Sequence, residues 1–254
     1  LDQAKHAAWK KDLPLVLMPA ILSTDAAYTS AIAVREEGRV RYIGEVYPEH
    51  LLVDSGLLQA APAVYNQSGV GDILSIFTAL WDWKQASDRG EEKFSTGIAA
   101  RSEALLERLY KGVADLRMVS EHGLELLSEL FCEEVQLCEE AGSSRPEEGS
   151  EHHLAYCIEA QTKKSFLHGR LVCLCVKLVA DYQGQDTRQV YEFLRDLTLD
   201  CCPAAVGVNR EELYRALVGM KDFIEEEKQL LPGAFHFFGG VSRADARALV
   251  QAVS

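Results

Sequence analysis

Apolar residues recur at helical spacing along most of the chain beyond residue 62. In the segment 68–86 they occupy positions 73, 76, 77 and 80, which gives a helix with one apolar face. The spacing repeats in RSEALLERLYKGVADLRMV, GLELLSELFCEEVQLC, RLVCLCVKLVADY, TRQVYEFLRDLTL and REELYRALVGMKDFIEEEKQLL. A last segment, ADARALVQAV, follows Ser242, a residue type that is common at helix N-caps. The pattern predicts an all-helical domain over residues 63–254.

The first 62 residues follow a different pattern. It predicts a helix, a short buried strand, a polar loop, a β-hairpin and another short strand over residues 1–10, 13–19, 21–30, 31–45 and 51–56. The hairpin is expected to turn at Glu36-Glu37-Gly38. Because strands and helices alternate, residues 1–62 are typical of an α/β layer. The fold class expected from the pattern is therefore α/β plus all-α.

Two histidines, His152 and His168, flank a polar stretch at residues 161–165. On one straight helix they would lie roughly 24 Å apart, too far to bind one ion. If the polar stretch breaks the helix, both histidines could instead converge near the starts of two helices. The pattern leaves two alternatives open, a shared metal ion and two unrelated polar residues.

Two further sets of polar residues could take part in chemistry. Asp72 follows Gly69-Val70-Gly71 at the start of a predicted helix, where it is either a third metal ligand or an acid stabilised by the helix dipole. Ser23-Thr24-Asp25 follows the first buried strand, where α/β proteins often bind ligands. An Asx-turn or a helix cap is the alternative for that loop.

Composition excludes several classes of partner. The chain has 254 residues, 48% of them hydrophobic, with a formal net charge of −13. Nucleic acid and anionic membrane surfaces are therefore not expected as partners, because both require a basic face. We find neither an apolar run of membrane-spanning length nor a signal-peptide pattern. The seven cysteines are odd in number and lie mostly in helical patterns, which predicts reduced thiols in a cytoplasmic protein.

Five segments in order resemble a known superfamily. They are MPAILSTDAAYTSAIAV, LLVDSGLL, SGVGDILSIFTALWDWKQA, GSSRPEEGSEHHLAYCIE and FLHGRLV. Together they resemble the iron-containing alcohol dehydrogenase and dehydroquinate synthase-like superfamily, and the SRP…GSEHH and GD…DWK segments are most similar to glycerol-1-phosphate dehydrogenases. The resemblance covers residues 1 to about 180. It implies a truncated Rossmann-like N-terminal piece and a helical metal-binding domain, with a catalytic metal between them.

The resemblance also implies roles for individual residues. The metal ligands of the family match Asp72, His152 and His168. Asp25 matches a substrate-binding aspartate, and Tyr156 stands where the family has a second histidine. Asp25 and Tyr156 are thus expected to orient the substrate beside the metal-bound Asp72. A phenol can donate a hydrogen bond, but it is a poorer base than imidazole at neutral pH.

Cofactor residues are implied in the same way. Ser23, Thr24 and Thr29 match positions near the nicotinamide. Ala20 replaces a threonine that would face the cofactor. LDQAKHAAWK matches the helix that follows the family's glycine-rich turn, and the turn itself is missing from this sequence. We expect the chain as given to bind metal better than dinucleotide, either as a fragment or as a protein that has lost this part.

The expected function is interconversion of dihydroxyacetone phosphate and glycerol 1-phosphate by a dehydrogenase that uses a divalent metal and NAD or NADP. Zinc, iron and nickel all suit the ligand set. Arg170, beside His168-Gly169, could favour a phosphate or face water. Glycerol dehydrogenase and a sugar-phosphate cyclase are alternatives within the superfamily, and a degenerate, non-catalytic binding partner is an alternative of another class. The sequence leaves a homo-oligomer open.

Overall fold

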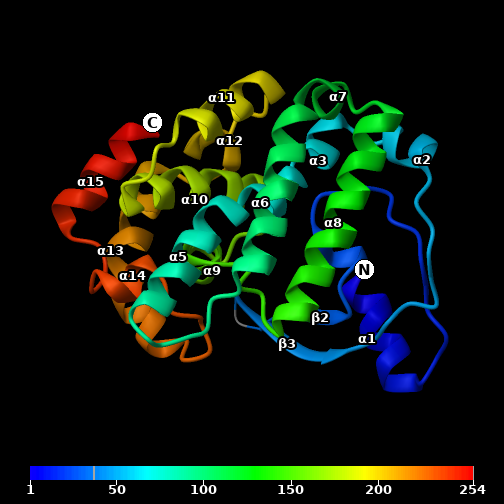
Figure 1. Ribbon diagram of the computed structural model, residues 1–254, viewed down its shortest axis with the longest axis horizontal. Helices are drawn as coiled ribbons and strands as arrows, with labels where there is room; N and C mark the ends of the chain where they lie inside the picture. Colours follow the sequence, from blue (N-terminus) through cyan, green and yellow to red (C-terminus); the bar gives the residue numbers. More distant parts are fainter. Residues whose placement is uncertain (37, 254) are drawn as a thin grey trace.

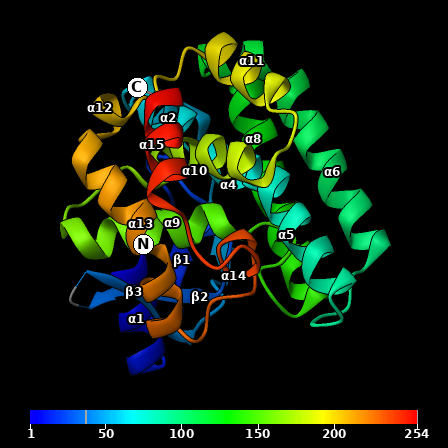
Figure 2. The ribbon, with the colours of Figure 1, turned by 90° about the vertical axis from the view of Figure 1, so that its left-hand side faces the viewer.

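The computed structural model describes residues 1–36 and 38–253. Figures 1 and 2 both show helix α1 and the β2–β3 hairpin at the lower end of the molecule, with a large group of helices above them. β3 packs against α9, and the short helix η1 packs against α8. The N-terminal elements therefore cover one end of the helical part.

The N-terminal region contains two small sheets. Its elements are α1 (Asp2–Lys11), β1 (Val16–Leu17), η1 (Asp25–Ala27), β2 (Ala31–Glu36), β3 (Arg39–Glu45) and β4 (His50–Leu51). β1 pairs with β4 in parallel, and β2 pairs with β3 antiparallel. The predicted hairpin is confirmed, although Glu37 of its turn lies outside the described residues.

The prediction of a strand over residues 51–56 is wrong for most of that segment. β4 ends at Leu51, and helix α2 (Ser55–Gln59) begins four residues later. The Asp54 side chain accepts a hydrogen bond from the Leu57 amide at 2.8 Å. This N-cap satisfies a free helix donor, so the local polar residue starts a helix where the apolar run suggested a strand.

The rest of the described chain is helical. Its helices are α3 (Ala63–Gln67), α4 (Val70–Leu74), α5 (Ile76–Asp88), α6 (Thr96–Lys111), α7 (Val113–Met118), α8 (Glu121–Ala141), α9 (Ser150–Thr162), α10 (His168–Gln183), α11 (Arg188–Leu197), α12 (Pro203–Val206), α13 (Arg210–Glu226), α14 (Ala234–Phe237) and α15 (Arg243–Ala252). The Ser242 side chain caps α15 as predicted. In the described residues, no helix is both long and apolar enough to cross a bilayer.

Helix α10 runs through the core. Residues 171–176 and 178–180 are fully buried. A helix that is apolar around most of its circumference must be surrounded by others, and α4, α5, α9, α12, α14 and α15 pack around it. α9 ends at Thr162, and the left-handed backbone of its C-cap residue Lys163 (φ 55°) turns the chain before α10 begins at His168. The predicted break is thus confirmed, and it begins two residues later than the polar stretch suggested.

Candidate metal and substrate site

A cavity of about 630 Å³ lies between the N-terminal elements and helices α4, α8, α9 and α10. All eight residues singled out by the resemblance line it: Ser23, Thr24, Asp25, Thr29, Asp72, His152, Tyr156 and His168. They come from three separate parts of the sequence, and folding brings them to one place.

Asp72, His152 and His168 form a compact cluster in this cavity. One potential ligand atom from each lies within 4.8 Å of the other two. His168 Nε2 is 3.9 Å from Asp72 Oδ1, and the two imidazole centroids are 5.4 Å apart. Asp72 Oδ1 is buried without a hydrogen-bond partner in the described structure. Because a buried carboxylate oxygen is costly unless paired or bound to metal, these residues fit a divalent cation.

Two glycines allow this cluster to form. Gly71 precedes Asp72 in α4, and Gly169 follows His168 in α10. A Cβ on Gly71 would lie 2.2 Å from the Gly169 carbonyl oxygen, and a Cβ on Gly169 would lie 2.0 Å from the Ser68 carbonyl oxygen. The backbones of α4 and α10 therefore approach at a distance that only glycine permits. This contact places Asp72 beside His168.

A buried network orients His152. Its Nδ1 lies 3.0 Å from Glu151 Oε1, and Glu151 is fully buried. Glu151 also accepts hydrogen bonds from the Gly149 amide at 2.6 Å and from Thr78 Oγ1 at 2.5 Å. A carboxylate that accepts from one imidazole nitrogen leaves the other free for a cation. Glu151 thus directs His152 Nε2 into the cavity.

The buried charges shift one another's pKa values. Burial, together with the nearby Asp25, raises the pKa of Asp72 to about 7. Burial likewise raises the pKa of Asp25 to about 6 against the opposing effect of Lys5. Burial, with the charge of His152, lowers the pKa of His168 to about 3, so this imidazole is neutral and can act as a ligand.

His152 has the opposite shift. Burial would lower its pKa, but the hydrogen bond to Glu151 and the charges of Glu148, Glu151 and Asp72 raise it to about 9. In the absence of a metal ion, a proton on His152 therefore supplies positive charge that the surrounding carboxylates require.

Asp25 stands next to the cluster. Its backbone amide donates to Asp72 Oδ2 at 3.0 Å, which fixes the loop against α4. Thr24 Oγ1 accepts a hydrogen bond from the Ala26 amide at 3.2 Å, so the helix-cap alternative is correct for Thr24. Thr24 also lines the cavity. The loop is therefore held in place by its own cap and by Asp72.

Tyr156 lies close to both histidines. Its ring centroid is 5.9 Å from that of His152 and 6.4 Å from that of His168. Burial and the charge of Glu148 raise the pKa of Tyr156 well above its usual value. The phenol therefore keeps its proton at neutral pH and can donate a hydrogen bond to an oxygen in the cavity.

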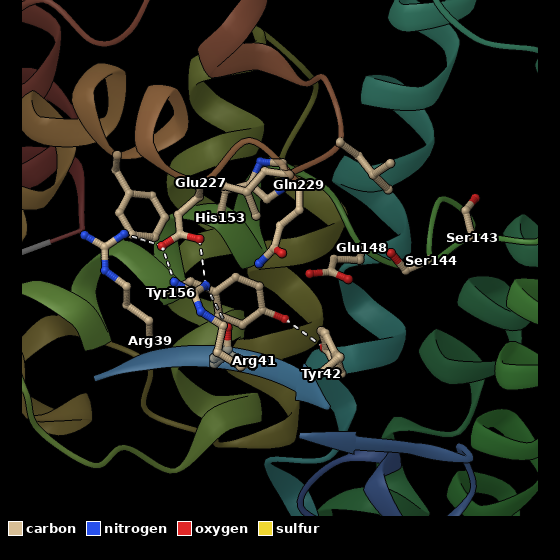
Figure 3. A pocket seen from close by; sticks show the side chains of 14 residues that line it. Arg39, Arg41, Tyr42, Ser143, Ser144, Glu148, His153, Tyr156, Glu227 and Gln229 are labelled. Atoms are coloured by element: carbon tan, nitrogen blue, oxygen red, sulfur yellow. Dashed lines mark hydrogen bonds and ion pairs between the residues drawn. The ribbon is translucent and has the colours of Figure 1, made fainter. Parts of the chain in front are cut away.

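A second cavity, of about 300 Å³, adjoins the first at Tyr156. In Figure 3 the hairpin residues Arg39 and Arg41 reach Glu227, and Tyr42 reaches Tyr156. The two phenol oxygens are 3.4 Å apart. Only 7% of the Glu227 side chain is exposed, so this carboxylate is largely shielded from solvent.

Sequence reasoning missed several cavity residues. Glu134, Glu147, Glu148, Tyr42 and Arg35 all line the larger cavity. Two adjacent glutamates, Glu147 and Glu148, stand shortly before the histidine motif and were a usable signal.

The phosphate role suggested for Arg170 is not supported. Its Nε donates to the Asp200 carbonyl oxygen at 2.6 Å. Arg170 is absent from the described residues that line either of the two cavities. An arginine in the first turn of a buried helix can point outward, and spacing in the sequence does not reveal this direction.

Comparisons with known proteins identify sequences that are similar to this chain. No family model matches the chain. The chain is 31% identical over 219 residues to the glycerol-1-phosphate dehydrogenase (NAD(P)+) of Thermoplasma volcanium, a match covering 85% of this chain and 62% of that protein. It is 25% identical over 252 residues to the protein of that name from Methanothrix thermoacetophila, covering 99% and 69%. The chain thus spans less than two thirds of the length of the first of these relatives.

Solved structures share the fold. Glycerol dehydrogenase from Schizosaccharomyces pombe matches with a TM-score of 0.66 at 16% identity, over 99% of this chain and 66% of that one. The iron-containing alcohol dehydrogenase from Corynebacterium glutamicum matches with a TM-score of 0.64 at 16% identity, over 98% and 69%. The chain is therefore similar in sequence to glycerol-1-phosphate dehydrogenases and shares the fold of iron-containing alcohol dehydrogenases.

Proposed function

We propose that this chain is part of a metal-dependent, NAD(P)-linked dehydrogenase that interconverts dihydroxyacetone phosphate and glycerol 1-phosphate. The observation that supports this proposal most is the convergence of Asp72, His152 and His168, with one buried Asp72 oxygen left without a partner in the described structure. The names of the relatives indicate the same reaction.

Asp72, His152 and His168 would hold the cation, and zinc, iron and nickel all suit this donor set. A bound cation would supply Lewis-acid stabilisation of negative charge on the substrate oxygen. Asp25 and Tyr156 line the cavity beside it and would orient the substrate, Tyr156 as a hydrogen-bond donor.

The nicotinamide cofactor would be bound by the N-terminal part. Ser23, Thr24 and Thr29 line the cavity near Asp25 and would contact NAD or NADP. In this proposal residues 1–62 belong to a Rossmann-like nucleotide-binding domain and residues 63–254 form the metal-binding domain. The seven free cysteines support a reducing, cytoplasmic location, and assembly as a homo-oligomer would be compatible with this proposal.

Activity assays test this proposal. Full-length protein, loaded with zinc, iron or nickel in turn, should oxidise glycerol 1-phosphate with NAD or NADP. Absence of turnover with any of these metals would contradict the proposed reaction. Stoichiometric metal binding without turnover would favour a degenerate, non-catalytic protein.

A second candidate is glycerol dehydrogenase, and the charge of the cavity favours it. The acidic residues that line the cavity are Asp2, Asp25, Glu45, Asp72, Glu134, Glu139, Glu147 and Glu148. Among the described lining residues Arg35 is the one arginine or lysine, and it pairs with Glu159 at 2.9 Å. Such a cavity favours a neutral polyol over a phosphate, unless a cation binds. Glycerol in place of glycerol 1-phosphate separates the two dehydrogenases, and a heptulosonate phosphate tests the sugar-phosphate cyclase alternative.

A further inference from the structure

The β2–β3 hairpin forms part of the wall of the larger cavity. Side chains alternate between the two faces of a strand, so Ala33 and Arg35 of β2 lie on the same face. Both line the cavity. Their partners across the hairpin, Tyr42 and Val40, line it as well. Arg35 therefore belongs to the cavity wall through its register on β2.

Helix α9 presents three residues to the same region. His152, Tyr156 and Glu159 follow one another at spacings of four and three residues, which places them on one face of the helix. Glu159 accepts a hydrogen bond from Nη2 of Arg35 at 2.9 Å. Only 2% of the Glu159 side chain is exposed. A buried carboxylate thus holds Arg35 on the face of α9 that carries a proposed metal ligand.

The spacing along this face suits a short phosphate ester. With a rise of 1.5 Å per residue, the seven residues from His152 to Glu159 span roughly 10 Å. The bond from the cation to a substrate oxygen and the hydrogen bonds from Arg35 would cover part of this length. A three-carbon chain that carries a phosphate at one end can cover the rest, and Tyr156 lies between the two ends.

The pKa values agree with this placement of Arg35. Burial and the charge of His152, with a contribution from Arg35, lower the pKa of His168. Burial opposes the charge of Arg35, but the hydrogen bond and charge of Glu159, with the nearby Tyr156, raise the pKa of this arginine. Arg35 therefore stays positively charged and lies close enough to His168 and Tyr156 to act on the same ligand.

Most of the donors of Arg35 are open. A guanidinium carries five N–H donors. In the part of the chain that the structure describes, Arg35 makes one hydrogen bond, to Glu159, and half of its side chain is exposed. The planar guanidinium matches two phosphate oxygens at once. One edge of Arg35 can therefore bind a phosphate while Glu159 holds the other.

We propose that Arg35 binds the phosphate of a substrate whose oxygen lies at the metal, with Tyr156 between them. This inference rests on the proposed function and names the residue that would distinguish glycerol 1-phosphate from glycerol. The cation and Arg35 together supply the positive charge that a phosphate requires in a cavity rich in acidic residues. The phosphate role that the sequence suggested for Arg170 thus passes to an arginine on the hairpin.

The test is the affinity of zinc-loaded full-length protein for glycerol 1-phosphate, measured by isothermal titration. Arg35→Gln should weaken this binding by about 10- to 100-fold, because it removes a hydrogen-bonded charge partner of the phosphate. It should not weaken zinc binding, because it removes a positive charge from the vicinity of the cation. Arg170→Gln is the matched control, since Arg170 is absent from the described lining of both cavities, and it should leave both affinities unchanged.

Unchanged affinity for glycerol 1-phosphate in Arg35→Gln, or no measurable affinity in wild type, would overturn the inference. A parallel loss of zinc binding would also overturn it, because Arg35 would then only hold the hairpin against α9. Arg35→Lys keeps the charge without the planar fork and should bind with intermediate affinity. It is the second variant if Arg35→Gln does not fold. The proposed function fails differently: glycerol 1-phosphate would then bind through Arg35 without being oxidised.

Discussion

Tyr156 lines two cavities whose charged residues are paired differently. On the hairpin side, Arg41 contacts Glu227 at 2.7 Å, and Arg39 pairs with the same carboxylate. On the metal side, Asp72 has an unpartnered buried oxygen in the described structure. Buried acids that already have arginine partners hold the fold together, whereas acids without them require a cation from outside. The difference separates a structural region from a functional one.

The largest expected effect is that of Asp72→Ala on metal binding. Removing the carboxylate between the two histidines takes away a ligand and a negative charge. We expect metal affinity to fall by about 100-fold or more. Loss of a residue that only orients a metal ligand already weakens binding by about 10- to 100-fold, and Asp72 is itself a proposed ligand. Isothermal titration of metal-depleted protein measures it, and circular dichroism checks folding. Unchanged stoichiometric binding would show that the cation lies elsewhere.

Glu151→Gln should weaken metal binding less, by about 10- to 100-fold. Glutamine retains the size of Glu151 but weakens the acceptor that orients His152, which lies 3.0 Å from Glu151 Oε1. The same titration measures the effect. An affinity equal to that of wild type would mean that the ring of His152 is fixed by other contacts.

Gly169→Ala should lower the stability of the protein at the contact between α10 and the segment that carries Asp72. A Cβ there would lie 2.0 Å from the Ser68 carbonyl oxygen, so the backbone at the end of α3 must move away from α10. We expect a loss of about 1–3 kcal/mol in the free energy of unfolding, together with weaker metal binding. Urea denaturation measures the stability. Gly97→Ala, at a helix position with open space around it, is the control and should be neutral or stabilising.

The smallest effect is expected on the hairpin side. Glu227→Gln removes a carboxylate that pairs with Arg39 and Arg41 and should cost about 1 kcal/mol of stability at neutral pH, without loss of metal binding. Hydrogen bonds from Arg41, with those from Arg39, lower the pKa of Glu227. A lowered pKa in the folded state stabilises the protein above the unfolded pKa, and this contribution disappears as pH falls through the folded value.

The difference in stability between wild type and Glu227→Gln should therefore shrink below about pH 4.5 and stay constant above it. Urea denaturation across pH 3–7 measures this dependence. A difference that does not change with pH would show that the ion pairs contribute little.

The sequence predicts the helical part of the fold because apolar residues recur at helical spacing, as in α11, where Val190, Phe193, Leu194 and Leu197 are buried. It fails at residues 51–56 because the Asp54 cap outweighs a short apolar run. Histidine spacing alone leaves the metal site open, and the resemblance joins Asp72 to His152 and His168. Neither the spacing nor the resemblance predicts that Glu147 lines the cavity, because its position depends on how the loop before α9 folds back onto Ser75.

The central claim is that one cation binds among residues far apart in the sequence. Anomalous scattering from crystals grown with zinc tests it most directly. The account predicts one strong peak per chain, within bonding distance of Asp72, His152 and His168. A cavity without a peak, or a zinc ion bound only at surface residues, would contradict it.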